Sequence, residues 1–206
     1  MSTRTETGSE KIAPDLPPEV PSFGNHFTRW IGRVGLRLLG WKVVGDFPAE
    51  KKFLIALAPH TSNWDFVTAI FALLAIGIKL SWLMKKEAFI WPFAKLFIAL
   101  GGIPINRGAA EDTVRQIHDW YENHEKVCVA ITPEGTRAKV AKWKTGFLRI
   151  VRHAGVPLFL VAWDYPSKRI VLDRCWDITS DNLVEESEKI RAYINSRFTG
   201  KHPENQ

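Results

Sequence analysis

Blocks of apolar residues alternate with polar segments along the chain, and their lengths and spacings predict alternating strands and helices. Short runs rich in β-branched and aromatic residues are typical of buried strands. They are Phe53–Ala58, Lys126–Thr132, Pro157–Trp163 and Arg169–Leu172, with a short extended piece at Ile103–Asn106. The longer segments with helical character are His26–Trp41, Asn63–Leu83, Glu111–His124, Lys144–Ala154 and Asn182–Arg197. This alternation indicates an α/β fold. The fold we expect is a single domain with a central mixed β-sheet flanked by helices.

The segment His26–Trp41 has an amphipathic pattern. Arg29, Arg33 and Arg37 recur every four residues and therefore share one helical face. Apolar residues fall mainly on another face, and they are Trp30, Ile31, Val34, Leu38 and Trp41. A basic helix with Trp near its ends is typical of a helix that lies in a membrane surface. A surface helix that packs onto the domain has the same pattern, so the sequence leaves both interpretations open.

A second aromatic segment, Glu87–Leu100, is interrupted by Pro92 and is another candidate for contact with lipid. A kinked core helix is the alternative interpretation. The longest apolar stretch, Phe66–Ile78, is short for a membrane-spanning helix. We therefore expect any membrane contact to be interfacial.

The length and composition suit one folded domain. The chain has 206 residues and is 46% hydrophobic, which is enough to form a core. Residues 1–21 are polar and proline-rich, so we expect a disordered tail there. The predicted organisation is a tail at 1–21, an amphipathic membrane-associating helix at 22–45 and the α/β domain at 46–206.

The net charge narrows the choice of partners. With 28 basic and 22 acidic residues the charge is +6, which favours anionic partners such as nucleic acid, lipid headgroups or phosphorylated substrates. The basic residues are dispersed and no nucleic-acid-binding motif is present, so we expect no nucleic acid partner. The two cysteines, Cys128 and Cys175, lack metal-ligand spacing, and we expect no metal.

Polar residues that can do chemistry follow the predicted strands. His60 comes directly after one strand and Asp65 lies five residues later. An Asp that accepts a hydrogen bond from one ring nitrogen leaves the other nitrogen to act as a general base for an alcohol. A capping loop, in which Ser62 or Asn63 caps the helix and Asp65 faces its dipole, accounts equally well for this spacing.

Two further clusters follow other strands. Thr132–Arg137 contains a Pro-Glu-Gly turn, and Arg137 can grip a phosphate or carboxylate while Glu134 holds that Arg or an acceptor hydroxyl. A tight turn with a surface ion pair is the alternative. Gly101–Arg107 brings a second Arg to the end of a short strand, and a simple turn with an exposed Arg107 is the alternative there.

The order of these motifs is more informative than any one of them. A His-x4-Asp box, a Gly-Ile-Pro-Ile-Asn-Arg segment, a Pro-Glu-Gly-Thr-Arg box and a strand beginning Val-Pro follow one another. The arrangement resembles the glycerolipid acyltransferase family that includes 1-acylglycerol-3-phosphate acyltransferase. The matching stretch runs from about His60 to Val161, half of the chain. The resemblance implies a glycerol-3-phosphate acyltransferase-like fold, with residues 46–206 as the acyltransferase domain.

The resemblance also implies a role for each matching residue. His60 is the general base and Asp65 orients it. The residues implied in substrate binding, chiefly of the acceptor's glycerol phosphate, are Asn63, Arg107, Glu134, Gly135, Thr136 and Arg137. The acyl chain would lie in an apolar groove, for which the candidate walls are the Phe66–Ile78 segment and the aromatic segment around Trp91.

The implied reaction moves a fatty acyl group from acyl-CoA or acyl carrier protein to the free hydroxyl of a lysophospholipid, converting lysophosphatidate to phosphatidate. The donor is a co-substrate, and no cofactor is expected. The implied partners are a membrane lipid surface, the acyl donor and the acceptor, with the protein peripheral or monotopic on the cytoplasmic face of a membrane, by default the bacterial inner membrane. Two alternatives stay open: another acceptor, such as a different lysophospholipid or lyso-ornithine lipid, and a non-catalytic lipid-binding module.

Overall fold

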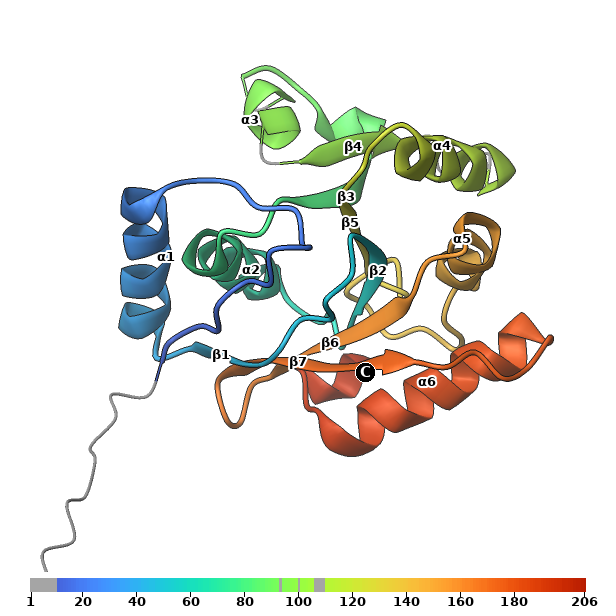
Figure 1. The fold of residues 1–206 in the computed structure, drawn as a ribbon. Helices are drawn as coiled ribbons and strands as arrows, with labels where there is room; N and C mark the ends of the chain where they lie inside the picture. The colour runs from blue at the N-terminus through green and yellow to red at the C-terminus, as the bar shows by residue number, and fades with distance from the viewer. Residues whose placement is uncertain (1–10, 93, 100, 106–109) are drawn as a thin grey trace, which may run out of the picture.

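The computed structural model describes residues 11–92, 94–99, 101–105 and 110–206, which form a seven-stranded sheet covered by helices (Figure 1). The strands are β1 Lys42–Gly45, β2 Lys52–Leu57, β3 Leu80–Lys85, β4 Gly102–Ile105, β5 Val127–Ile131, β6 Leu158–Asp164 and β7 Arg169–Trp176. The helices are α1 His26–Leu39, α2 Asn63–Ile76, α3 Ala94–Ala99, α4 Ala110–Glu122, α5 Gly146–Ala154 and α6 Leu183–Arg197, with short 3-10 helices η1 Lys86–Ala88 and η2 Pro203–Asn205.

The predicted mixed sheet is confirmed. The strand order is β1-β7-β6-β2-β5-β3-β4, and every neighbouring pair is parallel except the antiparallel pair β6–β7. Because β6, β2, β5 and β3 are adjacent and parallel, their carboxyl ends meet at one edge of the sheet. The polar segments after β2, β5 and β6 are thereby brought together although they are far apart in the sequence.

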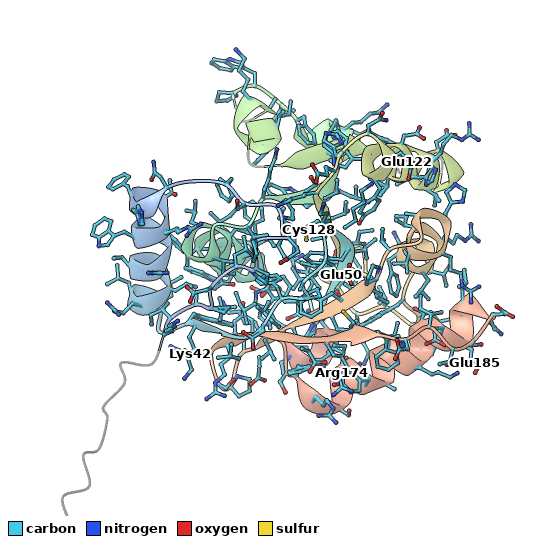
Figure 2. All side chains as sticks on the ribbon, viewed as in Figure 1. Lys42, Glu50, Glu122, Cys128, Arg174 and Glu185 are labelled. Carbon is cyan, nitrogen blue, oxygen red and sulfur yellow. The ribbon has the colours of Figure 1, made fainter. Side chains whose placement is uncertain are left out.

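Helices cover both faces of the sheet. One face packs against α1, α2 and the N-terminal segment, and the other packs against α4, α5 and α6 (Figure 1). The central strands are apolar on both sides, as expected for strands buried in a three-layer fold. Figure 2 shows Cys128 of β5 in the interior, whereas Glu122 and Glu185 lie at the periphery.

The prediction of a disordered tail over 1–21 is wrong for residues 11–21. Ala13 and Val20 are 3% and 2% exposed and belong to the core. The backbone of this segment pairs with the body, since Val43 N–H donates to Ile12 C=O and Lys79 N–H donates to Pro21 C=O. Apolar side chains between the prolines therefore hold the segment against the domain. The polar, proline-rich composition of the segment does not reveal these contacts. Residues 1–10 lie outside the described part.

The predicted amphipathic segment 22–45 divides into a helix and a strand. Asn25 caps α1, which ends at Leu39 because Gly40 adopts a left-handed conformation (φ 72°). Residues 42–45 then form β1, which pairs with β7, so the sheet begins before residue 46. The helix packs on α2 through buried Gly32, Gly35 and Leu36, and leaves Phe27, Trp30 and Leu38 exposed.

The single helix predicted over Asn63–Leu83 is a helix followed by a strand. Gly77, with φ 78°, ends α2, and β3 starts at Leu80. The aromatic segment Glu87–Leu100 is likewise broken, into η1 and the six-residue α3. Across residues 11–92, 94–99, 101–105 and 110–206, no helix combines the length and apolarity needed to cross a membrane.

Candidate active site

His60 and Asp65 form a hydrogen-bonded pair at the carboxyl end of β2. His60 Nδ1 lies 3.0 Å from Asp65 Oδ2, with Asp65 fully buried and the His60 side chain 15% exposed. An ionised carboxylate can only accept, so it fixes the ring proton on Nδ1. Nε2 is then the nitrogen with a lone pair, as a general base for an alcohol requires.

The capping interpretation of this loop is confirmed, and the cap is compatible with the pairing of His60 and Asp65. Ser62 caps α2 by accepting from Trp64 N–H, and Asp65 Oδ2 accepts from Ser62 N–H at 2.8 Å. Asp65 therefore completes a capping box and orients His60 with the same carboxylate oxygen. The helix start holds the pair rigid, because moving Asp65 would break the cap.

Two aromatic residues that the sequence analysis did not identify complete the surroundings of the pair. Tyr165, in the loop after β6, donates its hydroxyl to Asp65 Oδ1 at 2.5 Å. Trp163 of β6 packs beside the imidazole of His60, with ring centroids 5.6 Å apart, and donates from Nε1 to Thr68. The buried Asp65 carboxylate thus faces donors from His60, Ser62 and Tyr165, which offset the cost of burying its charge.

Glu134 is a buried residue, not part of a surface ion pair. It is 6% exposed, and its Oε1 accepts a hydrogen bond from the backbone N–H of His60 at 2.9 Å. Its Oε2 is buried without a hydrogen-bond partner. Burial raises the pKa of Glu134 to about 7, while the hydrogen bond from His60 opposes the shift. The side chain therefore supports the His60 loop from the turn that follows β5.

The turn after β5 depends on Gly135, which has φ 66° and donates its N–H to Thr132 C=O. A Cβ at Gly135 would also lie 2.9 Å from Lys144 Nζ. The exposed Thr136 accepts from Ala138 N–H and so stabilises the same turn. The predicted Pro-Glu-Gly turn is present, and it carries Arg137 out to an exposed position.

A cavity of about 400 Å³ opens beside His60. Its interior is apolar and lies between α2, β3, β5 and α5, with Phe66, Ile70, Leu73, Leu80, Phe147 and Ile150 among the lining residues. Its polar residues are His60, Thr113, Thr132, Arg137 and Lys144. The α2 wall is the one that the Phe66–Ile78 segment was expected to form. Trp91, the other candidate, is 91% exposed and does not line the cavity.

The structure brings together part of the predicted substrate-binding set. Gly135 and Arg137 line the cavity with His60, and Glu134 lies directly behind them. Among the described candidates, Asn63 and Thr136 are exposed and do not line the cavity. Arg107 lies outside the described residues, two positions beyond the end of β4.

This arrangement pairs a His–Asp base with an apolar cavity that has cations beside it. The base can activate an alcohol, the cavity can hold an acyl chain, and the cations can bind an anionic group. The combination is that of an acyltransferase.

Comparisons with known proteins agree with the class of site. The family model described as Acyltransferase matches residues 41–163, and the chain belongs to this family. The crystal structure of the 1-acyl-sn-glycerophosphate (LPA) acyltransferase PlsC from Thermotoga maritima is similar, with a TM-score of 0.55 and 17% sequence identity over 83% of this chain and 78% of that chain. The two proteins share a fold. No curated protein shows significant sequence similarity to the chain.

Proposed function

We propose that the protein transfers a fatty acyl group from a thioester donor, acyl-CoA or acyl carrier protein, to the free hydroxyl of a lysophospholipid. We propose lysophosphatidate as the acceptor and phosphatidate as the product. The observation that carries the proposal is the position of His60, whose ring is held by Asp65 at the wall of an apolar cavity that Arg137 and Lys144 also line.

The reaction needs one base and no covalent acyl-enzyme. His60 Nε2 takes the proton of the acceptor hydroxyl as its oxygen bonds to the thioester carbonyl carbon. The imidazolium is stabilised by the Asp65 carboxylate. As the tetrahedral intermediate collapses, the carbon–sulfur bond breaks and the thiolate leaves, taking the proton back from His60. The products are an ester and a free thiol.

The charged groups beside the cavity support a phosphate-bearing acceptor. Arg137 presents a planar fork of donors that matches phosphate oxygens, and Lys144 adds a second positive charge. Holding the phosphate fixes the acceptor hydroxyl relative to His60 and lowers the entropic cost of reaction.

The proposal includes attachment to a lipid surface by α1, on the cytoplasmic face of the membrane. Phe27, Trp30 and Leu38 are 65%, 59% and 82% exposed on one side of this helix. Trp30→Ser should weaken binding to phospholipid vesicles at least roughly tenfold, since inserting one large apolar side chain is worth about 1.5–3 kcal/mol. Trp120→Ser, which changes a 36% exposed Trp on α4, is the matched control and should leave vesicle binding unchanged.

The acceptor is tested by kinetics with two substrates, lysophosphatidate and the phosphate-free monoacylglycerol. Arg137→Ala should raise KM for lysophosphatidate and change the monoacylglycerol reaction little. Lys139→Ala, an exposed position two residues further along that does not line the cavity, is the control. Equal losses on both acceptors would contradict a phosphate-binding role for Arg137. Vesicle binding without turnover on any lysolipid would favour the non-catalytic module.

A further inference from the structure

A second, polar pocket lies between the N-terminal segment and α1, apart from the active-site cavity. It has a volume of about 190 Å³ and shares no lining residue with the cavity at His60. Its walls are the proline-rich segment, the inner flank of α1 and the end of α2. The lining residues are Pro14, Asp15, Leu16, Pro17, Pro18, Val20, Ser22, Arg29, Arg33 and Ile76.

The two arginines in this pocket have unused hydrogen-bond donors on their guanidinium groups. Among the residues that the structure describes, no carboxylate lies within ion-pair distance of Arg29 or Arg33. Arg29 Nε is buried without a hydrogen-bond partner, and a Cβ at Gly77 would lie 2.6 Å from it. Packing over Gly77, rather than pairing with an acid, therefore fixes this guanidinium.

One acidic residue, Asp15, also lines the pocket, and its carboxylate is bound by Lys11 Nζ at 2.8 Å. Counting Lys11, Arg29 and Arg33 against Asp15, the local charge is 3 − 1 = +2. A fixed guanidinium and a second one in a polar pocket are suited to a phosphate, which accepts several charge-assisted hydrogen bonds.

The position of the pocket on the helix indicates where such a phosphate comes from. Trp30 and Arg33 are three residues apart and so lie one above the other on the surface of α1. Phe27 stacks on Trp30, with centroids 6.0 Å apart, and both rings are exposed. Arg33 therefore borders the apolar side of α1, at the depth where lipid headgroups would lie if that side enters a membrane, and Arg29 lies one helical turn before it in the same pocket.

We propose that this pocket binds the phosphate of an anionic phospholipid in the membrane plane, through Arg29 and Arg33. The bound headgroup ties α1 and the N-terminal segment to the same lipid, and so orients the domain on the surface. The inference rests on the proposed membrane attachment of α1 but not on acyl transfer.

The test compares arginines of one helix. Binding to phosphatidylcholine vesicles is measured with and without phosphatidylglycerol, for the wild type, Arg33→Gln and Arg37→Gln. Arg37 is exposed on α1 outside the pocket, so its loss should cost only the roughly fivefold expected of one charge near an anionic surface. Arg33→Gln should cost roughly thirtyfold on anionic vesicles, because it also removes hydrogen bonds to the phosphate. Equal losses of vesicle binding in Arg33→Gln and Arg37→Gln would overturn the proposal that the pocket binds a phosphate.

Soluble probes separate the pocket from membrane attachment and from free phosphate. Dihexanoyl phosphatidylglycerol should bind the wild type in calorimetry and bind Arg33→Gln at least tenfold more weakly, whether or not vesicles bind. Asp15→Asn removes a negative charge from the wall and should strengthen this binding, whereas weaker binding would show that the pocket does not attract the lipid by its positive charge and would overturn the proposal. Inorganic phosphate binding as tightly as the short-chain lipid would overturn the lipid assignment. Arg29→Lys keeps the positive charge beside Gly77 but removes the guanidinium fork, so it should also bind the short-chain lipid more weakly than the wild type.

Discussion

The Asp65 carboxylate shows how single residues hold His60, the proposed general base. Tyr165 O–H donates to Asp65 Oδ1, and Asp65 Oδ2 faces His60 Nδ1. Tyr165→Phe removes the donor to Asp65 Oδ1, and so weakens the hydrogen bonding of the buried carboxylate that faces the imidazole. Because a hydrogen bond to a charged group is worth about 1.5–3 kcal/mol, we expect kcat to fall roughly tenfold or more with KM little changed.

A matched control exists for that variant. Tyr193 also donates its hydroxyl to an aspartate, Asp173, at 2.9 Å, but this pair lies on α6 and β7 and does not line the cavity. Tyr193→Phe should leave kcat unchanged. If both variants lost activity equally, Tyr165 would be a structural residue and not one that positions Asp65.

Glu134 gives the folded protein a pH-dependent stability. Its pKa of about 7 lies above the 4.5 of a free glutamate, because the carboxyl is buried. Between these two values the folded chain holds a proton that the unfolded chain has released. The free energy of unfolding therefore falls as the pH rises through this window, by about 3 kcal/mol in total.

Glu134→Gln removes this titration and keeps an oxygen that can accept from His60 N–H. Denaturant unfolding at pH 5 and pH 8 measures the free energy of unfolding at each pH, and the difference between the two values should be smaller for the variant than for the wild type. Equal pH dependence of the two proteins would show that Glu134 does not titrate in this range.

At the residue scale, the sequence predicted the parts of the site that lie in contiguous motifs. His60 and Asp65 are five positions apart, so a helix cap is sufficient to bring them together. Tyr165 is 100 positions from Asp65, and its contact exists only because β6 and β2 are neighbours in the sheet. No local sequence pattern identifies Tyr165 or Trp163 as site residues, because both look like ordinary aromatic residues at the end of an apolar strand.

At the scale of elements, the α1–α2 contact depends on glycine. A Cβ at Gly32 would lie 2.2 Å from the backbone nitrogen of Ala75. Gly32→Ala should therefore push the helices apart and destabilise the fold by about 2 kcal/mol, despite the better helix propensity of Ala. The measurement is denaturant unfolding. Gly146→Ala, where a Cβ meets no atom within 4 Å, is the control and should change stability by less than about 1 kcal/mol.

The strands that the sequence pattern failed to predict, β1 and β3, are short and follow directly after helices. Ile76, Gly77 and Ile78 continue the apolar run of α2 into the approach to β3, so periodicity did not reveal the break. Gly77 was the available signal, since its positive φ ends the helix. The predicted amphipathic segment includes the four-residue β1, because its identity as a strand comes from pairing with β7, which the local sequence does not show.

At the scale of the whole molecule, the parallel strands β6, β2 and β5 create the site. Their carboxyl ends place Tyr165, His60 and Glu134 at one edge, and α2 carries both Asp65 and the cavity wall. The α/β class was predictable from the alternation of elements. The strand order was not, because it depends on which apolar faces pack together over long sequence distances.

Release of free thiol from palmitoyl-CoA tests most directly whether His60 activates the acceptor. The purified protein is assayed in detergent with and without lysophosphatidate, alongside His60→Gln. Thiol release that requires both lysophosphatidate and His60 is the predicted result. Rapid thiol release without acceptor, or substantial turnover by a folded His60→Gln variant, would contradict direct activation of the acceptor by His60.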